Sequence, residues 1–234
     1  MSGTGILGDG FRPDVTIVRP EDFAGRYSFY DDGWTGRLLL EHDGDGRLWG
    51  TYHSDRDDRD YRASSSVGPP PHRIELIIHE FNWMDQQVYT GHLFSQGKGA
   101  FAGSSVWQGK PFGFFARRAT PLPLSAYRAG RAEPQDLLGG YGVRIDGYRL
   151  DLMLSQQRGE ALIGRCWNDR LGVDLPVEAS IGGEVPHQVR IVVGPGRPEA
   201  LSLDGYLFSE PKNAIAGSLQ WEDVRLGFYM IRYE

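Results

Sequence analysis

The chain has 234 residues, a net charge of −6, 40% hydrophobic and 24% charged residues, and 32 glycines and 14 prolines. This length suits one large domain or two small ones, and so many glycines and prolines without a collagen-like period indicate a fold with many tight turns. The acidic balance, and the lack of a basic cluster interleaved with aromatic residues, argue against nucleic acid as a partner.

Neither the apolar runs nor the start of the chain indicates a membrane or an export route. The apolar runs are far shorter than the roughly 20 residues of a membrane helix. The polar start MSGTGILGDG lacks the charged and apolar regions of a signal peptide. The single cysteine, Cys166, cannot form an internal disulfide and is interpreted as a small buried residue rather than a catalytic thiol. We therefore expect a cytoplasmic protein with no membrane partner.

An internal repeat dominates the sequence. Asp22–Gly68 aligns with Asp136–Gly182, and Gly91–Arg118 aligns with Gly205–Arg232, with more than a third of the aligned positions identical. Between these blocks the alignment slips by one residue at a proline-rich turn. We call two residues that this alignment matches "equivalent". The repeat predicts an N-terminal extension at 1–20, a first barrel repeat at 21–118, a proline-rich linker at 119–135 and a second barrel repeat at 136–234.

The N-terminal extension contains one short apolar run, VTIV at 15–18, which could form an extra strand. Within the first repeat, strand signals follow at short and regular spacing, at residues 23–30, 34–42, 47–54, 61–67, 73–81, 87–95, 100–107 and 111–117. Turn-forming Gly, Asp, Asn and Pro residues separate them. Eight antiparallel strands with short links close most simply into an up-and-down barrel, which leaves no exposed edge. The predicted fold is all-β, with two tandem eight-stranded antiparallel up-and-down β-barrels.

Both faces of the eighth strand are apolar in each repeat. Phe112, Phe114 and Phe115 in the first repeat are equivalent to Leu226, Phe228 and Tyr229 in the second. A second apolar face implies that something covers it. We expect these strands to form either a contact between the two barrels or a homo-oligomer contact. His72 and its counterpart His187 recur at the start of the fifth strand, where we expect them to cap a turn.

Two stretches of the first repeat carry a resemblance to a known family. The stretch FAGRYSFYDDGWTGRLLLEHDGDGRLWGTYHSD and the later VYTGHLF resemble the first strands and the sixth strand of the avidin and streptavidin family, which are calycin-type eight-stranded barrels. The resemblance implies that Tyr52 and Ser54 point into the barrel and that Trp107 walls a pocket. The family's first-turn Asn and Ser correspond here to Phe29 and to Gly33 or Trp34, so biotin is not the expected ligand.

The lumen of an eight-stranded barrel holds side chains or one small ligand. Six residues are candidates for lining such a ligand site, the last of them as a cap in the loop after the fifth strand: Tyr52, Ser54, Tyr89, Ser105, Trp107 and Trp83. The alternative is that these residues fill a closed core. The second repeat has Cys166 and Asn168 at the positions of Tyr52 and Ser54, so the first repeat is the better site candidate.

Catalytic candidates are Tyr52 and Glu80, the latter near the end of the fifth strand, where burial would raise its pKa. The histidines show no metal-ligand spacing, and we expect neither a metal nor a cofactor. Three functions remain open. The first is binding of a small, largely apolar metabolite. The second is a cofactor-independent cyclase or isomerase of natural-product biosynthesis that uses the barrel as a reaction chamber. The third is a structural or interaction module with solid interiors.

Overall fold

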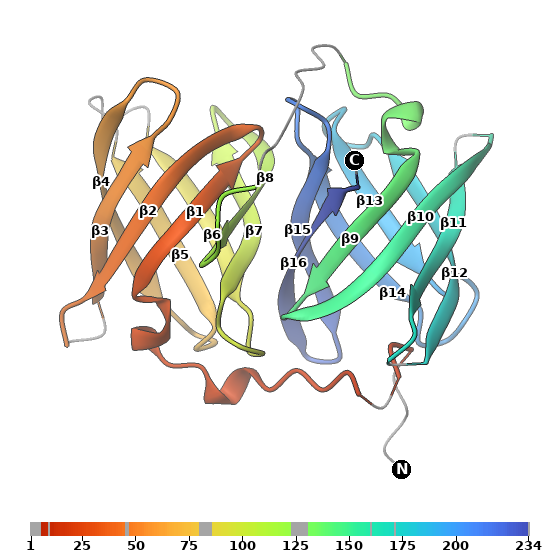
Figure 1. Ribbon diagram of the computed structural model, residues 1–234, viewed down its shortest axis with the longest axis horizontal. Helices are drawn as coiled ribbons and strands as arrows, with labels where there is room; N and C mark the ends of the chain where they lie inside the picture. Colours follow the sequence, from red (N-terminus) through yellow and green to blue (C-terminus); the bar gives the residue numbers. More distant parts are fainter. Residues whose placement is uncertain are drawn as a thin grey trace.

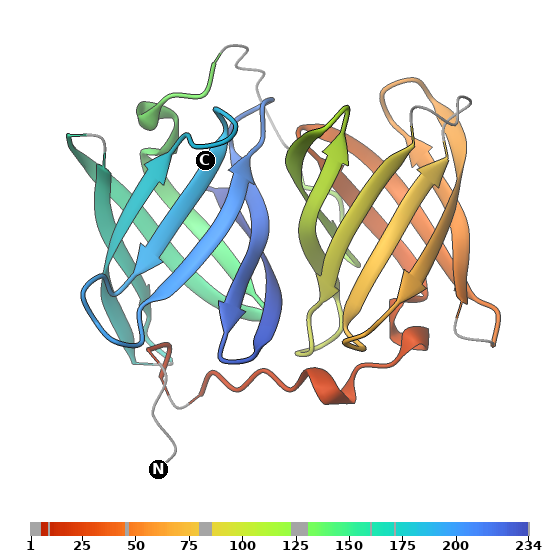
Figure 2. The ribbon, with the colours of Figure 1, turned by 180° about the vertical axis from the view of Figure 1, so that it is seen from behind.

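The computed structural model describes residues 6–8, 10–44, 47–79, 86–122, 131–159, 161–170 and 172–233. It consists of two closed eight-stranded antiparallel barrels side by side, as Figures 1 and 2 show from opposite sides. The predicted all-β fold with two tandem barrels is therefore confirmed. None of the helices in these ranges has the length and apolar character needed to cross a membrane.

Each strand pairs with its neighbours in sequence, and the last strand of each barrel closes onto the first. Barrel 1 consists of β1 (Gly25–Asp31), β2 (Trp34–His42), β3 (Arg47–Ser54), β4 (Arg59–Val67), β5 (Arg73–His79), β6 (Gln87–Leu93), β7 (Ala100–Trp107) and β8 (Lys110–Arg117). Barrel 2 consists of β9 (Gly139–Ile145), β10 (Tyr148–Arg158), β11 (Ala161–Asn168), β12 (Val173–Ile181), β13 (Gln188–Val193), β14 (Leu201–Leu207), β15 (Ala214–Trp221) and β16 (Val224–Arg232).

Alternation along the strands fills each lumen with apolar side chains. On β5 the side chains of Ile74, Leu76 and Ile78 are buried in the core of barrel 1, whereas their neighbours face outward, as the sequence predicts. The VTIV run does not add a strand. It begins a short 3-10 helix, η1 (Val15–Ile17), inside an extended N-terminal segment that runs below both barrels in Figure 1.

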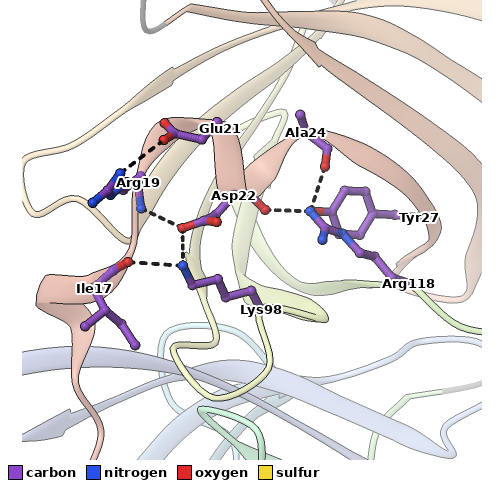
Figure 3. Close-up of polar contacts among 8 residues, drawn as sticks. All are labelled: Ile17, Arg19, Glu21, Asp22, Ala24, Tyr27, Lys98 and Arg118. Carbon is purple, nitrogen blue, oxygen red and sulfur yellow. Dashed lines mark hydrogen bonds and ion pairs between the residues drawn. The ribbon is translucent and has the colours of Figure 1, made fainter.

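A second 3-10 helix, η2 (Pro20–Phe23), closes the base of barrel 1, with Phe23 fully buried. Figure 3 shows the contacts that hold it. Lys98 Nζ donates to the Asp22 carboxylate at 2.5 Å, and Arg118 Nη2 donates to the Ala24 carbonyl at 2.7 Å and to the Tyr27 hydroxyl at 2.9 Å.

The same contacts recur at the base of barrel 2, under η4 (Pro134–Leu137). There Lys212 Nζ donates to Asp136 at 2.7 Å, and Arg232 Nη2 donates to the Tyr141 hydroxyl at 2.8 Å. These residues are identical in the two repeats because both bases are built in the same way. The other end of each barrel, where β1 meets β2 and where β9 meets β10, is free of this network.

Aromatic rings from both barrels stack between them. Phe115 on β8 and Tyr229 on β16 are equivalent residues, and their ring centroids lie 4.4 Å apart at an angle of 13°. Tyr30 stacks on Phe115 at 4.6 Å, and Phe94 stacks on Tyr229 at 5.8 Å. The second apolar face of each eighth strand is thus covered by the other barrel of the same chain.

Reciprocal hydrogen bonds frame this stack. The Asp32 carboxylate, in the β1–β2 turn, accepts from the Ser209 backbone N–H of barrel 2 at 2.7 Å, and its equivalent Asp146 accepts from Ser95 of barrel 1. His72 Nε2 lies 2.7 Å from the Arg225 carbonyl oxygen.

The second member of the histidine pair makes the matching contact, with His187 Nε2 lying 2.9 Å from the Pro111 carbonyl oxygen. The expectation that these histidines cap a local turn is therefore wrong, because each reaches across to the eighth strand of the other barrel. In a two-fold arrangement, a residue that one copy uses to contact the other is needed in both copies, which explains why this histidine is present in both repeats.

Replacing Phe115 with Asp tests this contact. The variant places an unpaired charge among the three aromatic rings that contact Phe115, those of Tyr30, Phe208 and Tyr229. We expect the free energy of unfolding to fall by on the order of 4 kcal/mol or more. Urea unfolding measures the loss. Trp49→Asp is the control, because Trp49 is 50% exposed on the outer face of β3, and its cost should stay within about 1 kcal/mol. Equal costs for the two variants would contradict a shared interface.

Candidate functional site

Barrel 1 has a pocket of about 520 Å³ at the end opposite η2, which we call the mouth pocket. Its lining residues come from all eight strands and two turns, at this one end: Asp31, Asp32, Trp34, Tyr52, Ser54, Arg56, Asp57, Tyr61, Ile78, Gln87, Trp107 and Phe112. The volume lies within the usual range for small-molecule sites. Aromatic or aliphatic residues and polar or charged residues share its wall in equal numbers, which is compatible with ligand binding.

A buried carboxyl forms the polar centre of the pocket. Asp31 is the last residue of β1 and is 8% exposed. Its Oδ1 accepts a hydrogen bond from Ser105 Oγ at 3.0 Å, and its Oδ2 accepts one from the Tyr89 hydroxyl at 2.9 Å. Tyr89 and Ser105 are paired across β6 and β7, which places both hydroxyls beside the end of β1.

Burial raises the pKa of Asp31 from 3.8 to about 7; the nearby Asp32 adds to the rise, and the hydrogen bonds from Tyr89 and Ser105 offset part of it. The Tyr89 hydroxyl also contacts the side-chain oxygen of Gln87. One hydroxyl has one proton, so a protonated Asp31 reconciles both contacts by donating to Tyr89, whose own proton then bonds Gln87. Near neutral pH, Asp31 can therefore both accept and donate a proton.

Aromatic and charged side chains form the rim. The guanidinium of Arg56 lies 3.5 Å from the centre of the Trp34 ring. Tyr61 stacks near Tyr52, with ring centroids 6.4 Å apart, and its hydroxyl donates to Asp57. This bond holds the pKa of the exposed Asp57 below its ordinary value, whereas burial raises the pKa of Tyr52.

The residues expected from the sequence fall into three groups. Tyr52, Ser54 and Trp107 line the mouth pocket. Tyr89 and Ser105 are buried beside it and hydrogen-bonded to Asp31. Trp83 and Glu80 lie outside the described residues.

Barrel 2 carries an apolar set in place of the polar centre. Asp31 and Ser105 are equivalent to Ile145 and Leu219, and the strand register places Leu203 at the position of Tyr89; all three residues are buried in the core of barrel 2. The strand registers match, since Leu203 pairs with Leu219 as Tyr89 pairs with Ser105. All three polar residues of one barrel are therefore apolar in the other.

Barrel 2 is also closed at the corresponding end. Ile6, Leu7 and Phe11 of the N-terminal segment are buried in the core cluster of barrel 2. The Phe11 ring lies 4.6 Å from the ring of Tyr148 and 4.6 Å from that of Trp221. Cys166 of barrel 2, which is equivalent to Tyr52, is buried, and burial raises the pKa of its thiol to about 12. A thiol in such surroundings is an unreactive packed side chain.

Sequence reasoning missed Asp31 and Phe11. Asp31 stands in the run DDG, which by itself indicates only a turn, and Phe11 lies in the N-terminal extension, which has no counterpart in the repeat. A signal for Asp31 was present in the alignment, because Asp31, Tyr89 and Ser105 are all replaced by aliphatic residues in the second repeat. A set of positions that changes from polar to apolar together marks groups that contact one another.

Known proteins add little to this description. No protein-family model matches the chain, and no curated protein is significantly similar. Among solved structures, a protein with unknown function from the DUF3598 family of Nostoc punctiforme is similar at 13% identity over 92% of this chain and 99% of that one, with a TM-score of 0.32. A similarity this low supports no functional conclusion.

The mouth pocket can bury a small molecule and exchange one hydrogen bond or proton with it through Asp31. Within the described ranges, no three His, Cys, Asp or Glu side chains gather in a way that could hold a metal ion. The functional groups that the structure shows at the pocket are Asp31, its hydroxyl partners, and the aromatic and charged side chains of the rim.

The raised pKa of Asp31 predicts a pH-dependent stability. Between pH 4 and 7 the folded protein keeps a proton on Asp31 that the unfolded chain has released, so the free energy of unfolding falls as pH rises through this range. Urea unfolding measures this effect by comparing wild type with Asp31→Asn. From pH 5 to pH 8, we expect the free energy of unfolding of wild type to fall by roughly 2 to 3 kcal/mol more than that of the variant.

Asp146, whose pKa burial raises to about 6, contributes in the same direction but is present in both proteins, so the difference between them isolates Asp31. A difference that stays constant from pH 5 to pH 8 would show that Asp31 is ionised in the folded protein throughout.

Proposed function

We propose that barrel 1 binds a small, largely apolar molecule in its mouth pocket, and that barrel 2 serves as a scaffold. The observation that carries the proposal is the joint replacement of Asp31, Tyr89 and Ser105 by aliphatic residues in barrel 2. If these residues only filled space, aliphatic side chains would serve in both barrels, since barrel 2 packs well with them.

Burying the Asp31 carboxyl lowers the stability of barrel 1, and a barrel core can form without such a group, as barrel 2 does. Burying a polar group is unfavourable unless partners compensate for the lost water, and the raised pKa of Asp31 shows that its two hydrogen bonds compensate only in part. Such perturbed groups in a concave pocket are typical of functional sites. A purely structural role for barrel 1 does not account for this carboxyl.

A second candidate is acid–base catalysis in the same pocket. Asp31 has a pKa of about 7 and faces the pocket, so near neutral pH it is divided between its acid and base forms. This is the condition under which a carboxyl serves best as general acid or base. A cofactor-independent cyclase or isomerase needs such a group in a preformed apolar chamber.

Native mass spectrometry of the protein incubated with a cellular metabolite extract tests the binding proposal. We expect one compound to be retained per chain. The variant Asp31→Ile, Tyr89→Leu, Ser105→Leu copies barrel 2 into barrel 1 and should lose the compound, because its polar contact is gone. Asp31→Asn, which nearly preserves shape, should weaken retention at least tenfold if the compound bonds the carboxylate, as expected for a charged hydrogen bond of about 1.5 to 3 kcal/mol.

Leu219→Val is the matched control, since it alters barrel 2 at the position equivalent to Ser105 and leaves the mouth pocket intact. Retention by the triple variant equal to that of wild type would refute binding in this pocket. Catalysis is distinguished by the fate of the compound. Conversion by wild type that Asp31→Asn abolishes while still retaining the substrate would favour the enzyme.

A further inference from the structure

We infer that the ligand of the mouth pocket presents an aromatic ring between Trp34 and Trp107 and directs a hydrogen-bond donor, an amine, amide or hydroxyl group, to Asp31. This inference rests on the proposed function and names the chemical class of its ligand. It is drawn from barrel 2, whose corresponding end is already occupied by a part of the chain.

Phe11 is the occupant of that end in barrel 2. Its ring meets Tyr148 at an angle of 54° and Trp221 at an angle of 75°, in the tilted and edge-on geometries that aromatic pairs prefer. Only 4% of Phe11 is exposed. The backbone N–H of the next residue, Arg12, donates to the Tyr148 hydroxyl at 3.1 Å. The mouth of barrel 2 thus encloses one phenyl ring with two aromatic walls.

The two aromatic walls have equivalents in barrel 1. Trp34 begins β2 and pairs with Asp31, just as Tyr148 begins β10 and pairs with Ile145. Trp107 ends β7 and Trp221 ends β15, each at the same hairpin register. Both barrels therefore place an aromatic pair at the same points around the same end.

The aromatic pair of barrel 1 is exposed. Trp34 is 40% exposed and Trp107 is 41% exposed, whereas Tyr148 and Trp221 are packed against the core of barrel 2. The Arg56 guanidinium lies against Trp34, and among the described residues neither tryptophan pairs with another aromatic ring. Two exposed tryptophans thus stand at the rim of the pocket, at the positions where barrel 2 has two packed walls around Phe11.

The floor of the pocket specifies the polar group. Barrel 2 has the aliphatic residues Ile145, Leu203 and Leu219 where barrel 1 has its polar centre, but the pocket of barrel 1 reaches Asp31. Asp31 Oδ1 accepts one bond, from Ser105, and in either protonation state of the carboxyl it keeps acceptor capacity for the ligand. The other charged groups that line the pocket are Asp32, Asp57 and Arg56, so carboxylates outnumber cations and favour a donor over an anion.

Matched probes separate the two parts of this ligand class. Titrations followed by ligand-observed NMR compare 2-phenylethylamine with 2-cyclohexylethylamine, which lacks the aromatic ring, and with ethylbenzene, which lacks the donor. We expect 2-phenylethylamine to bind at least fivefold more tightly than either. Trp34→Leu and Trp107→Leu should each weaken it at least fivefold, whereas Trp49→Leu, on the outer face of β3, should leave it unchanged.

Phe11→Ala tests the template itself. In the folded variant, the space between Tyr148 and Trp221 becomes vacant, and ethylbenzene should bind there even when Asp31→Asn is also present. Folding of each variant is checked by circular dichroism. If Phe11→Ala proves unstable, the Trp34 and Trp107 variants still test the inference independently. A folded Phe11→Ala protein that gains no affinity for ethylbenzene overturns the use of barrel 2 as a template.

Equal affinity for the phenyl and cyclohexyl amines, or no effect of the Trp34 and Trp107 variants, overturns the inference. So does retention from the metabolite extract of a compound without an aromatic ring, and in that case the proposed function stands. Retention of no compound from the extract overturns the proposed function itself, which separates the two failures.

Discussion

The stack of Phe115 on Tyr229 fixes how the two barrels face each other, and the positions of both barrel ends follow from it. Because the two residues are equivalent, their stacking relates the barrels by an approximate two-fold axis. Close approach requires glycine on each side. A Cβ at Gly113 would lie 2.5 Å from the Ala216 carbonyl oxygen, and one at Gly227 would lie 2.5 Å from that of Ala102. The duplicated unit is therefore built to pack against its own copy.

This two-fold arrangement turns the barrels in opposite directions. The N-terminal segment consequently runs along one side of the molecule from the mouth of barrel 2 to the base of barrel 1, where Lys98 binds the Ile17 carbonyl at 3.1 Å (Figure 1). One segment closes two different ends. The opposite orientation leaves the mouth of barrel 1 on the far side of the molecule from this segment. The segment therefore covers the mouth of barrel 2 and not that of barrel 1.

Local physics made the strands and barrels predictable from the sequence. Turns such as Asp32-Gly33 need positive φ angles, here 45° and 96°, and residues that tolerate them are visible in the sequence. Alternation then gives the inward face of each strand, and five of the six expected pocket residues lie at or beside the mouth pocket or in contact with Asp31. Trp83 is the exception, since it lies outside the described residues.

The remaining features depend on contacts between distant parts of the chain. A buried Asp31 cannot be distinguished from an exposed turn aspartate until Tyr89 and Ser105 are known to meet it. For the same reason, His72 and His187 carry no sign that their partners belong to the other barrel. Phe11 closes barrel 2 from a segment without any regular pattern, and periodicity gives no information about such contacts.

Duplication also explains how the chain tolerates the cost of Asp31. A single barrel of this size has a limited core, and a buried carboxyl whose ionised form is disfavoured consumes part of the marginal free energy that keeps such a domain folded. Barrel 2 keeps aliphatic residues at the same three positions, and it stabilises barrel 1 through the aromatic interface. The stability that barrel 2 contributes thus offsets the cost of the polar centre in barrel 1. A substitution that destabilises barrel 2 should therefore lower the fraction of folded barrel 1, although it touches no residue of the mouth pocket.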